Sequence, residues 1–139
     1  MSKYRIDMNQ VEERRAPEPL VRYARVLLDR DVIEDAPLAV ATYRFEPGQR
    51  GVKHSHPTQV EIYFGLKGRG EVEFLGEAHE LTPGVLLYIP PQADHDTRNV
   101  GDEDFEFLSV FVPPVDLSMF RSWPACSEPR AAGRENREV

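Results

Sequence analysis

GQRGVKHSHPTQVEIYFGLKG (residues 48–68) and GVLLYIPPQADHDTRN (residues 84–99) are the two segments that decide the fold of this 139-residue chain. Between them they hold three of its four histidines, His54, His56 and His95. The first segment also contains Glu61 within a β-branched and aromatic run, which is typical of a strand. These four side chains are the candidates for a metal site.

His54 and His56 are separated by one residue, and side chains of a strand alternate between its two faces. Both imidazoles are therefore expected on one face, about 7 Å apart along the backbone. Glu61 can reach the same point from the next strand, and His95 supplies a third nitrogen. Three neutral imidazoles and a carboxylate suit a divalent first-row metal, and in an octahedral ion they leave two positions open.

The two segments resemble the motifs of the cupin superfamily. The first matches the family at Gly48, His54, His56, Glu61 and Gly68, and the second matches it at Gly84, Pro90, His95 and Asn99. Gln92 stands where the second motif has glycine, so the local turn is the one departure. The segment between the motifs, residues 69–83, is short for the family. The resemblance implies a metal-binding, single-domain, all-β protein: a double-stranded β-helix, or jelly-roll barrel.

Period-two alternation and turn residues predict seven to nine short strands. We expect them at Val21–Leu28, Leu38–Phe45, Val52–His56, Val60–Leu66, Glu71–Leu75, Val85–Ile89, His95–Asn99 and Phe105–Val112, with Glu77–Leu81 as a strand or a turn. Val21–Leu28 is also compatible with a helix. The apolar run Val85–Ile89 is expected to be buried on both faces or to be a central strand.

The predicted organisation is an N-terminal arm (1–19), one barrel (20–115) and a C-terminal segment (116–139). In the last segment, Leu117 to Trp123 could form a short helix on the barrel. Low apolar content predicts partial disorder beyond it.

Composition excludes several classes of partner. The formal net charge is −7, and nucleic acids and anionic membranes require basic clusters. No apolar run approaches the roughly 20 residues that span a bilayer, and the polar start Met1 to Arg15 does not read as a signal peptide. The single cysteine, Cys126, cannot form an internal disulfide. A cytoplasmic protein with a small-molecule substrate is expected.

Two residues beside the ligands are candidates for catalysis. Gln59 and Tyr63 flank Glu61 at period two, so they share its face if the strand is regular. The Tyr63 hydroxyl could donate to a developing oxyanion or act as an acid, and an inward Gln59 amide needs a partner. Each also has a plain interpretation as a packing residue. His79 is expected in a solvated turn.

The cupin resemblance leaves the reaction open, because one scaffold hosts many chemistries. Our first hypothesis is an Fe(II) dioxygenase that acts on a carbonyl or enolisable substrate. The alternatives are a non-redox isomerase, lyase or cyclase with the metal as Lewis acid (Mn, Ni, Co, Cu or Zn are also suitable), and a binding protein without turnover. A homodimer is expected, because Val21–Leu28 would lie at a sheet edge and need covering.

Overall fold

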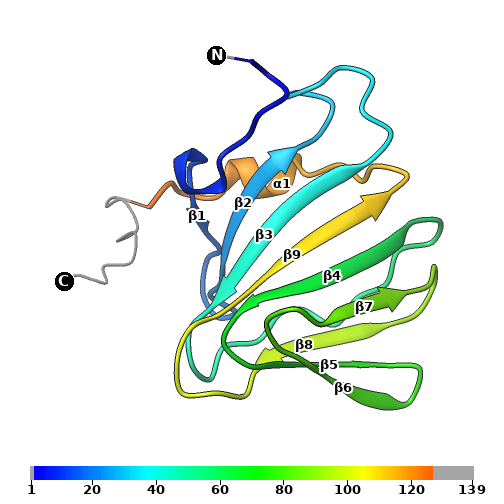
Figure 1. The fold of residues 1–139 in the computed structure, drawn as a ribbon. Helices are drawn as coiled ribbons and strands as arrows, with labels where there is room; N and C mark the ends of the chain where they lie inside the picture. Colours follow the sequence, from blue (N-terminus) through cyan, green and yellow to red (C-terminus); the bar gives the residue numbers. More distant parts are fainter. Residues whose placement is uncertain (1, 127–139) are drawn as a thin grey trace.

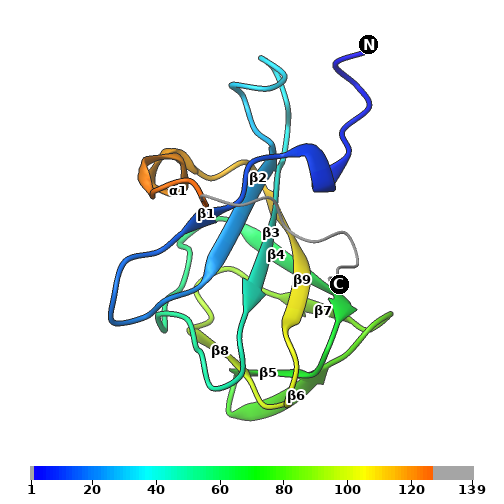
Figure 2. The ribbon, with the colours of Figure 1, turned by 90° about the vertical axis from the view of Figure 1, so that its left-hand side faces the viewer.

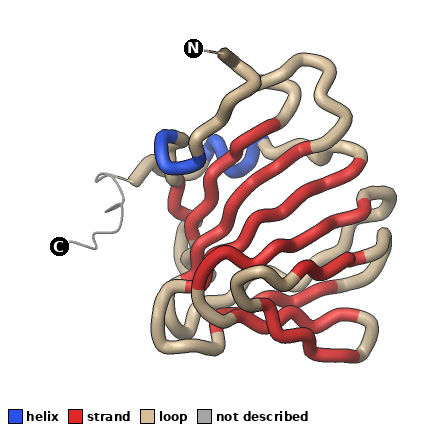
Figure 3. Tube along the Cα trace, viewed as in Figure 1, coloured by secondary structure: helices blue, strands red, loops and turns tan. Residues whose placement is uncertain are grey.

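The computed structural model describes residues 2–126 and is built mainly of antiparallel strands (Figure 1; Figure 3). The described strands are β1 (Arg14–Arg15), β2 (Tyr23–Leu28), β3 (Ala39–Phe45), β4 (Val60–Lys67), β5 (Gly70–Phe74), β6 (Glu77–Leu81), β7 (Leu86–Ile89), β8 (His95–Asn99) and β9 (Phe105–Val112). Two short helices flank them: a 3₁₀ helix at Met8–Gln10, and α1 (Ser118–Ser122). The predicted all-β class is confirmed.

The strands form two sheets. One has six strands in the order β1-β2-β3-β9-β4-β7, and the other has three in the order β6-β5-β8. Neighbours in sequence are often not neighbours in the sheet, since β9 lies between β3 and β4. Figure 2, which turns the view by 90°, shows the three-stranded sheet below the larger one. This is the arrangement expected of a jelly roll.

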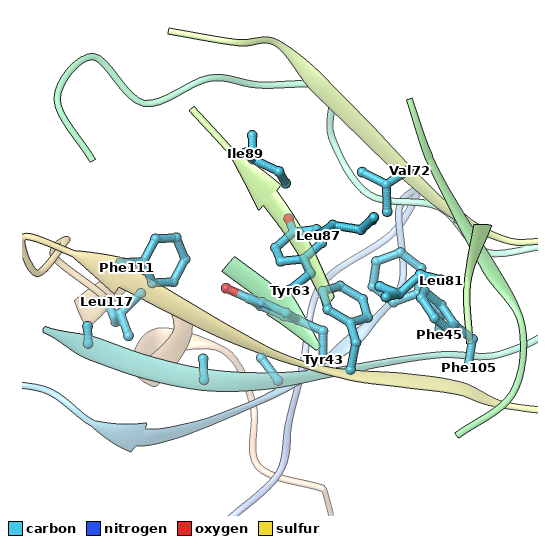
Figure 4. Packing of buried hydrophobic residues seen from close by; sticks show 14 of the residues in the cluster. Tyr43, Phe45, Tyr63, Val72, Leu81, Leu87, Ile89, Phe105, Phe111 and Leu117 are labelled. Carbon is cyan, nitrogen blue, oxygen red and sulfur yellow. The ribbon is translucent and has the colours of Figure 1, made fainter. Parts of the chain in front are cut away.

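The core is formed by the side chains that point inward from each strand. In β9 these are Phe105, Phe107, Ser109 and Phe111, which are all buried. The Phe107 ring packs with Tyr43, Phe45 and Tyr63 from the neighbouring strands β3 and β4, and the Phe105 ring packs with Phe45. Figure 4 shows this cluster. Aromatic pairs at such spacing contribute beyond their buried area, so β9 ties the larger sheet to the core.

Gln92, which replaces the glycine of the second motif, still forms the expected turn. Gln92 has φ +71°, the left-handed conformation that glycine adopts without steric cost. The motif glycines Gly48, Gly68 and Gly84 also have positive φ. The Gln92 backbone N–H donates to His56 O at 2.7 Å, which ties this turn to the first motif. The turn is therefore formed despite the missing glycine.

Two local predictions are wrong. Residues 52–56 are not a regular strand: this segment contacts β8 through one isolated antiparallel bridge, between His54 and His95. Val85–Ile89 is not buried on both faces, because β7 ends the six-stranded sheet and both Leu86 and Tyr88 are 56% exposed. Apolar content predicts a strand here, but it does not distinguish a buried face from an uncovered one.

The N-terminal residues cover the other end of the larger sheet. β2 is a strand, as expected, but it is not an edge, because β1 pairs with it. Arg25 of β2 is buried, donates to Val11 O at 3.0 Å and forms ion pairs with Glu13 and Glu106. The reason given for a dimer, an uncovered strand at Val21–Leu28, is therefore wrong.

The helix predicted near the C-terminus is confirmed: α1 covers Ser118–Ser122. α1 lies beside β2 (Figure 2), and the flanking residues Leu117 and Trp123 are buried. Disorder was predicted for Cys126–Val139; Cys126 is described, and its backbone N–H donates to Glu13 O at 2.9 Å. Residues 127–139 lie outside the described residues. The divisions at residues 19 and 115 stay predictions, although β1 shows that the arm contributes to the sheet.

Within residues 2–126, no helix is both long enough and apolar enough to span a bilayer. The cytoplasmic location stays a prediction.

Gly70 of β5 lies directly against the ring of Phe105 of β9 in the other sheet, which yields a test of the packing. A Cβ built on Gly70 would lie 2.1–2.5 Å from the Phe105 ring. Gly70→Ala should therefore lower the free energy of unfolding by about 1–3 kcal/mol, the usual cost of overpacking. Urea denaturation measures this.

Gly101→Ala is the control, because its Cβ would meet its nearest neighbours at ordinary contact distances of 3.5 Å or more. Equal stability of the Gly70→Ala protein and the wild type would contradict the packing described for β5 and β9.

Candidate metal centre

The structure brings together the four side chains that the sequence predicts as metal ligands. His54, His56, Glu61 and His95 each offer one nitrogen or oxygen atom, and these atoms all lie within 4.8 Å of one another. Glu61 is the second residue of β4, and His95 is the first residue of β8. The two sheets therefore each supply a side chain, and the segment before β4 supplies the other two.

A pair of backbone hydrogen bonds sets the first histidine beside the third. His95 N–H donates to His54 O at 2.9 Å, and His54 N–H donates to His95 O at 3.2 Å. This antiparallel contact places the two rings 4.3 Å apart between centroids. A complete strand at residues 52–56 is therefore unnecessary, since one bridge positions His54.

Hydrogen bonds at Nδ1 orient two of the rings. His54 Nδ1 lies 2.7 Å from Val52 O, and His95 Nδ1 lies 3.1 Å from Ala93 O. A carbonyl oxygen only accepts, so each Nδ1 carries the proton and each Nε2 is left as an acceptor. Metal-binding histidines commonly have this arrangement, with the second nitrogen held by an outer hydrogen bond.

Three buried acceptor atoms in the cluster have no hydrogen-bond partner: His56 Nε2, Glu61 Oε1 and His95 Nε2. Glu61 Oε1 is 3.0 Å from His95 Nε2 and 3.5 Å from His56 Nε2. A carboxylate oxygen and a bare imidazole nitrogen repel each other at this distance unless a proton or a metal cation lies between them. The donor set therefore fits a divalent cation of the kind that imidazole and carboxylate bind.

The charge of the cluster favours a cation. Burial alone would raise the pKa of Glu61, but the neighbouring imidazoles of His56 and His95 and the hydrogen bond from Ser109 outweigh burial and lower this pKa to about 2. Glu61 is therefore ionised at neutral pH. Burial opposes charge on His95, but the neighbouring Glu61 carboxylate outweighs this effect and raises the pKa of His95. The negative charge of Glu61 thus stabilises whichever cation occupies the centre.

Ser109 is a member of the site that sequence reasoning missed. Its hydroxyl donates to Glu61 Oε2 at 2.7 Å, and its side chain is fully buried. This bond holds one carboxylate oxygen and leaves Oε1 facing the histidines. The signal in the sequence is weak: Ser109 is the one hydroxyl at an inward position of β9, where the other inward residues are phenylalanines.

The two predicted catalytic residues differ in their surroundings. Tyr63 is 3% exposed, and its ring centroid lies 5.9 Å from that of His95. Burial chiefly, with the negative charge of Glu61, raises the pKa of Tyr63 well above its usual value, so the hydroxyl keeps its proton. Gln59 lies in the segment before β4 and is half-buried. The catalytic role of either residue stays a prediction.

His79 is not the solvated turn residue that was expected. It lies in β6, stacks on Phe74 with ring centroids 4.2 Å apart, and has Nδ1 3.2 Å from Val72 O. It does not belong to the cluster of four, so it has a packing role.

The comparisons with known proteins agree with this geometry. Residues 41–111, just over half of the chain, match the Cupin domain family. An uncharacterized protein from Methanocaldococcus jannaschii is 31% identical over 90 residues, which is 65% of this chain and 72% of the relative. A glucose-6-phosphate isomerase from Pyrococcus abyssi is 31% identical over 129 residues, which is 84% of this chain and 67% of the relative. Other matched glucose-6-phosphate isomerases are covered over only 37% of their length.

A solved structure shares the fold. The crystal structure of a predicted oxalate decarboxylase from Thermotoga maritima superposes with a TM-score of 0.71, covers 78% of this chain and 98% of that one, and is 21% identical. At this identity the likeness establishes the fold alone. Together with the match over residues 41–111 and the histidine and glutamate cluster, it shows that the chain belongs to the cupin family.

Proposed function

We propose that this chain is a metal-dependent enzyme that interconverts the aldose and ketose forms of a small sugar or sugar phosphate. The observation that carries the proposal is the convergence of the three buried acceptor atoms of His56, Glu61 and His95 without a donor between them. His54 completes the ligand set from the more exposed side. The proposed cofactor is one divalent transition ion; the donor set suits Fe(II) and also Mn, Co, Ni, Cu or Zn.

The relatives favour the isomerase alternative over the dioxygenase that was our first hypothesis. The similarity to the glucose-6-phosphate isomerase of Pyrococcus abyssi extends over 84% of this chain, well beyond the metal motifs. None of the relatives named above carries the name of an oxygen-cleaving enzyme. An aldose–ketose conversion also needs no second substrate, because one hydrogen moves from C2 to C1 and one proton moves from the hydroxyl oxygen on C2 to the carbonyl oxygen on C1.

Exposure indicates the side from which a substrate would approach. Glu61 and His95 are buried, with side chains 2% and 1% exposed, whereas the His56 side chain is 18% exposed and His54 is open to solvent. A bound divalent cation would act as a Lewis acid toward the oxygens of the sugar. Tyr63, which keeps its proton, would donate a hydrogen bond to the oxygen on which charge develops.

The ligand set predicts near-stoichiometric metal binding. The wild-type protein should bind about one transition ion per chain, and His95→Ala should abolish binding, because it removes a buried nitrogen that faces Glu61. Metal analysis after dialysis and isothermal titration calorimetry measure both. His79→Ala is the matched control and should keep full occupancy. Full occupancy in the His95→Ala protein would show that the ligands are wrongly assigned.

The Ser109 hydroxyl predicts an effect on metal affinity without loss of a ligand. Ser109→Ala frees Glu61 Oε2 to rotate, and the loss of such an outer hydrogen bond commonly weakens metal binding about 10–100-fold. Competition with a chromogenic chelator measures the dissociation constant. Thr42→Val is the control, because Thr42 is equally buried but points to the opposite face of the larger sheet. Unchanged affinity in the Ser109→Ala protein would rule out the positioning role.

The activity itself is tested with metal-loaded protein under argon. Glucose 6-phosphate should be converted to the corresponding ketose. Unphosphorylated glucose is assayed in parallel to determine whether the phosphate is required. Tyr63→Phe should lower kcat about 100-fold or more if the hydroxyl acts as a general acid, while Tyr4→Phe, which alters an exposed ring of the arm, should not.

Turnover that requires oxygen would restore the dioxygenase hypothesis. Tight sugar binding without conversion would favour the non-catalytic binding protein.

A further inference from the structure

Arg22 is a half-buried arginine that contacts no carboxylate in the described part of the chain. It lies just before β2, and its Nη1 donates to Leu20 O at 2.7 Å. Two other enclosed arginines are neutralised, because Arg25 and Arg44 both form ion pairs with Glu13. Charges that are taken out of water are normally paired in this way. Arg22 therefore has a positive charge that the described residues do not compensate.

An aromatic contact orients the guanidinium of Arg22. Its Cζ lies 5.1 Å from the centroid of the Trp123 ring, within the range of a cation–π interaction. Trp123 is itself buried and packs against Phe120, with ring centroids 4.8 Å apart. Leu20 O engages one donor of the guanidinium, so further N–H groups are left for another acceptor. An arginine held over an aromatic ring is preorganised for bidentate contact with a carboxylate or a phosphate.

Three observations place Arg22 on the inner face of the larger sheet. Ala24 of β2 lies opposite Tyr43, a core residue of β3, and in an extended segment Arg22 shares the face of Ala24. Phe120, which packs against Trp123, also contacts the Tyr43 ring, with centroids 5.7 Å apart. The positive charge of Arg22 also acts on the pKa of Tyr43, so the two side chains are close. The guanidinium is therefore on the same side of the sheet as the metal centre.

Tyr43 lies between Arg22 and the metal centre. Burial chiefly raises the pKa of Tyr43 well above its usual value; the negative charge of Glu61 adds to this increase, and the positive charge of Arg22 opposes it. The phenol is thus within electrostatic range of a candidate metal ligand and of the guanidinium. In the sheet, β9 and β3 separate β4 from β2, which is three spacings or roughly 14 Å. A ligand that reaches from the metal to Arg22 is consequently a chain of several carbon atoms.

We infer that Arg22 binds an anionic group, a phosphate or a carboxylate, at the far end of a substrate whose carbonyl end lies at the metal centre. The inference rests on the proposed function and narrows its substrate class to sugars with an anion at the end remote from the carbonyl. Such a ligand supplies the partner that the Arg22 charge lacks. The chain has a net charge of −7 and repels anions in general, so recognition of an anionic sugar requires a local positive group.

Three sugar acids that differ only at the far end test the inference by binding, without turnover. Gluconate, glucarate and 6-phosphogluconate share a carboxylate at C1, and they have a hydroxyl, a carboxylate and a phosphate, respectively, at C6. Isothermal titration calorimetry with the metal-loaded full chain measures the three dissociation constants. At least one of the two ligands with an anionic C6 end should bind about 10–100-fold more tightly than gluconate, the usual effect of a hydrogen bond to a charged group. The tighter of the two identifies the anion.

Arg22→Gln should abolish this preference, and Arg22→Lys, which keeps the charge but not the planar fork of donors, should retain part of it. Arg30→Gln is the matched control: Arg30 also donates to a backbone carbonyl, that of Ala36 at 3.3 Å, but it is exposed, so the preference should persist. Circular dichroism establishes that the variants are folded. Arg22→Met, which keeps an unbranched stem over Trp123, replaces Arg22→Gln if that variant does not fold.

Equal affinity of the wild-type protein for all three ligands would overturn the inference. A preference for an anionic C6 end that survives in the Arg22→Gln protein would overturn it as well, since the anion would then be bound elsewhere. Both results leave the proposed reaction intact, because that reaction is measured by conversion of glucose 6-phosphate. Conversely, a preference that depends on Arg22 in a protein that converts no sugar would overturn the proposed reaction and keep Arg22 as the anion-binding residue.

Discussion

The site depends on one unfavourable contact, in which buried nitrogen and oxygen atoms of Glu61, His95 and His56 face one another without any hydrogen-bond donor between them. Glu61 Oε1 lies 3.0 Å from His95 Nε2 and 3.5 Å from His56 Nε2, and none of the three has a hydrogen-bond partner. Leaving buried polar groups unpaired costs free energy, so they are rare in native proteins. A cation at their centre converts this repulsion into attraction. The fold therefore maintains an arrangement of these atoms that is energetically favourable when a metal cation is bound.

The two sheets of the jelly roll make this arrangement rigid. β8 supplies His95 and, through two backbone hydrogen bonds, positions His54, while β4 supplies Glu61 from the other sheet. Ser109 of β9 then holds the second oxygen of that carboxylate. Because β4 and β9 lie side by side over nearly their whole length, a shift in their register would separate Glu61 from Ser109 and from the histidines. The proposed sugar isomerisation uses this rigidity, since it requires fixed positions for the ligands and for the Tyr63 hydroxyl.

The cluster of four candidate ligands and most strands could be predicted from the sequence because their signals are local. The spacing of His54, His56 and Glu61 matches a known motif, and the alternation in β3 to β5 specifies which side chains share a face. The remaining features depend on contacts distant in sequence. The sequence does not indicate that Ser109, the one serine among the inward phenylalanines of β9, donates to Glu61. The apolar sequence of β7 also does not indicate whether its outer face is buried or exposed to solvent. The reaction could not be predicted, because the same donor set serves oxygenases and isomerases; only the relatives favoured the isomerase.

The central claim, that His54, His56, Glu61 and His95 bind one ion, is tested most directly by anomalous X-ray diffraction from crystals of the metal-loaded protein. The account predicts a single strong anomalous peak per chain, within about 2.0–2.2 Å of the three histidine Nε2 atoms and a Glu61 oxygen. A peak bound by other residues, or no peak at this cluster in crystals that contain stoichiometric metal, would contradict it.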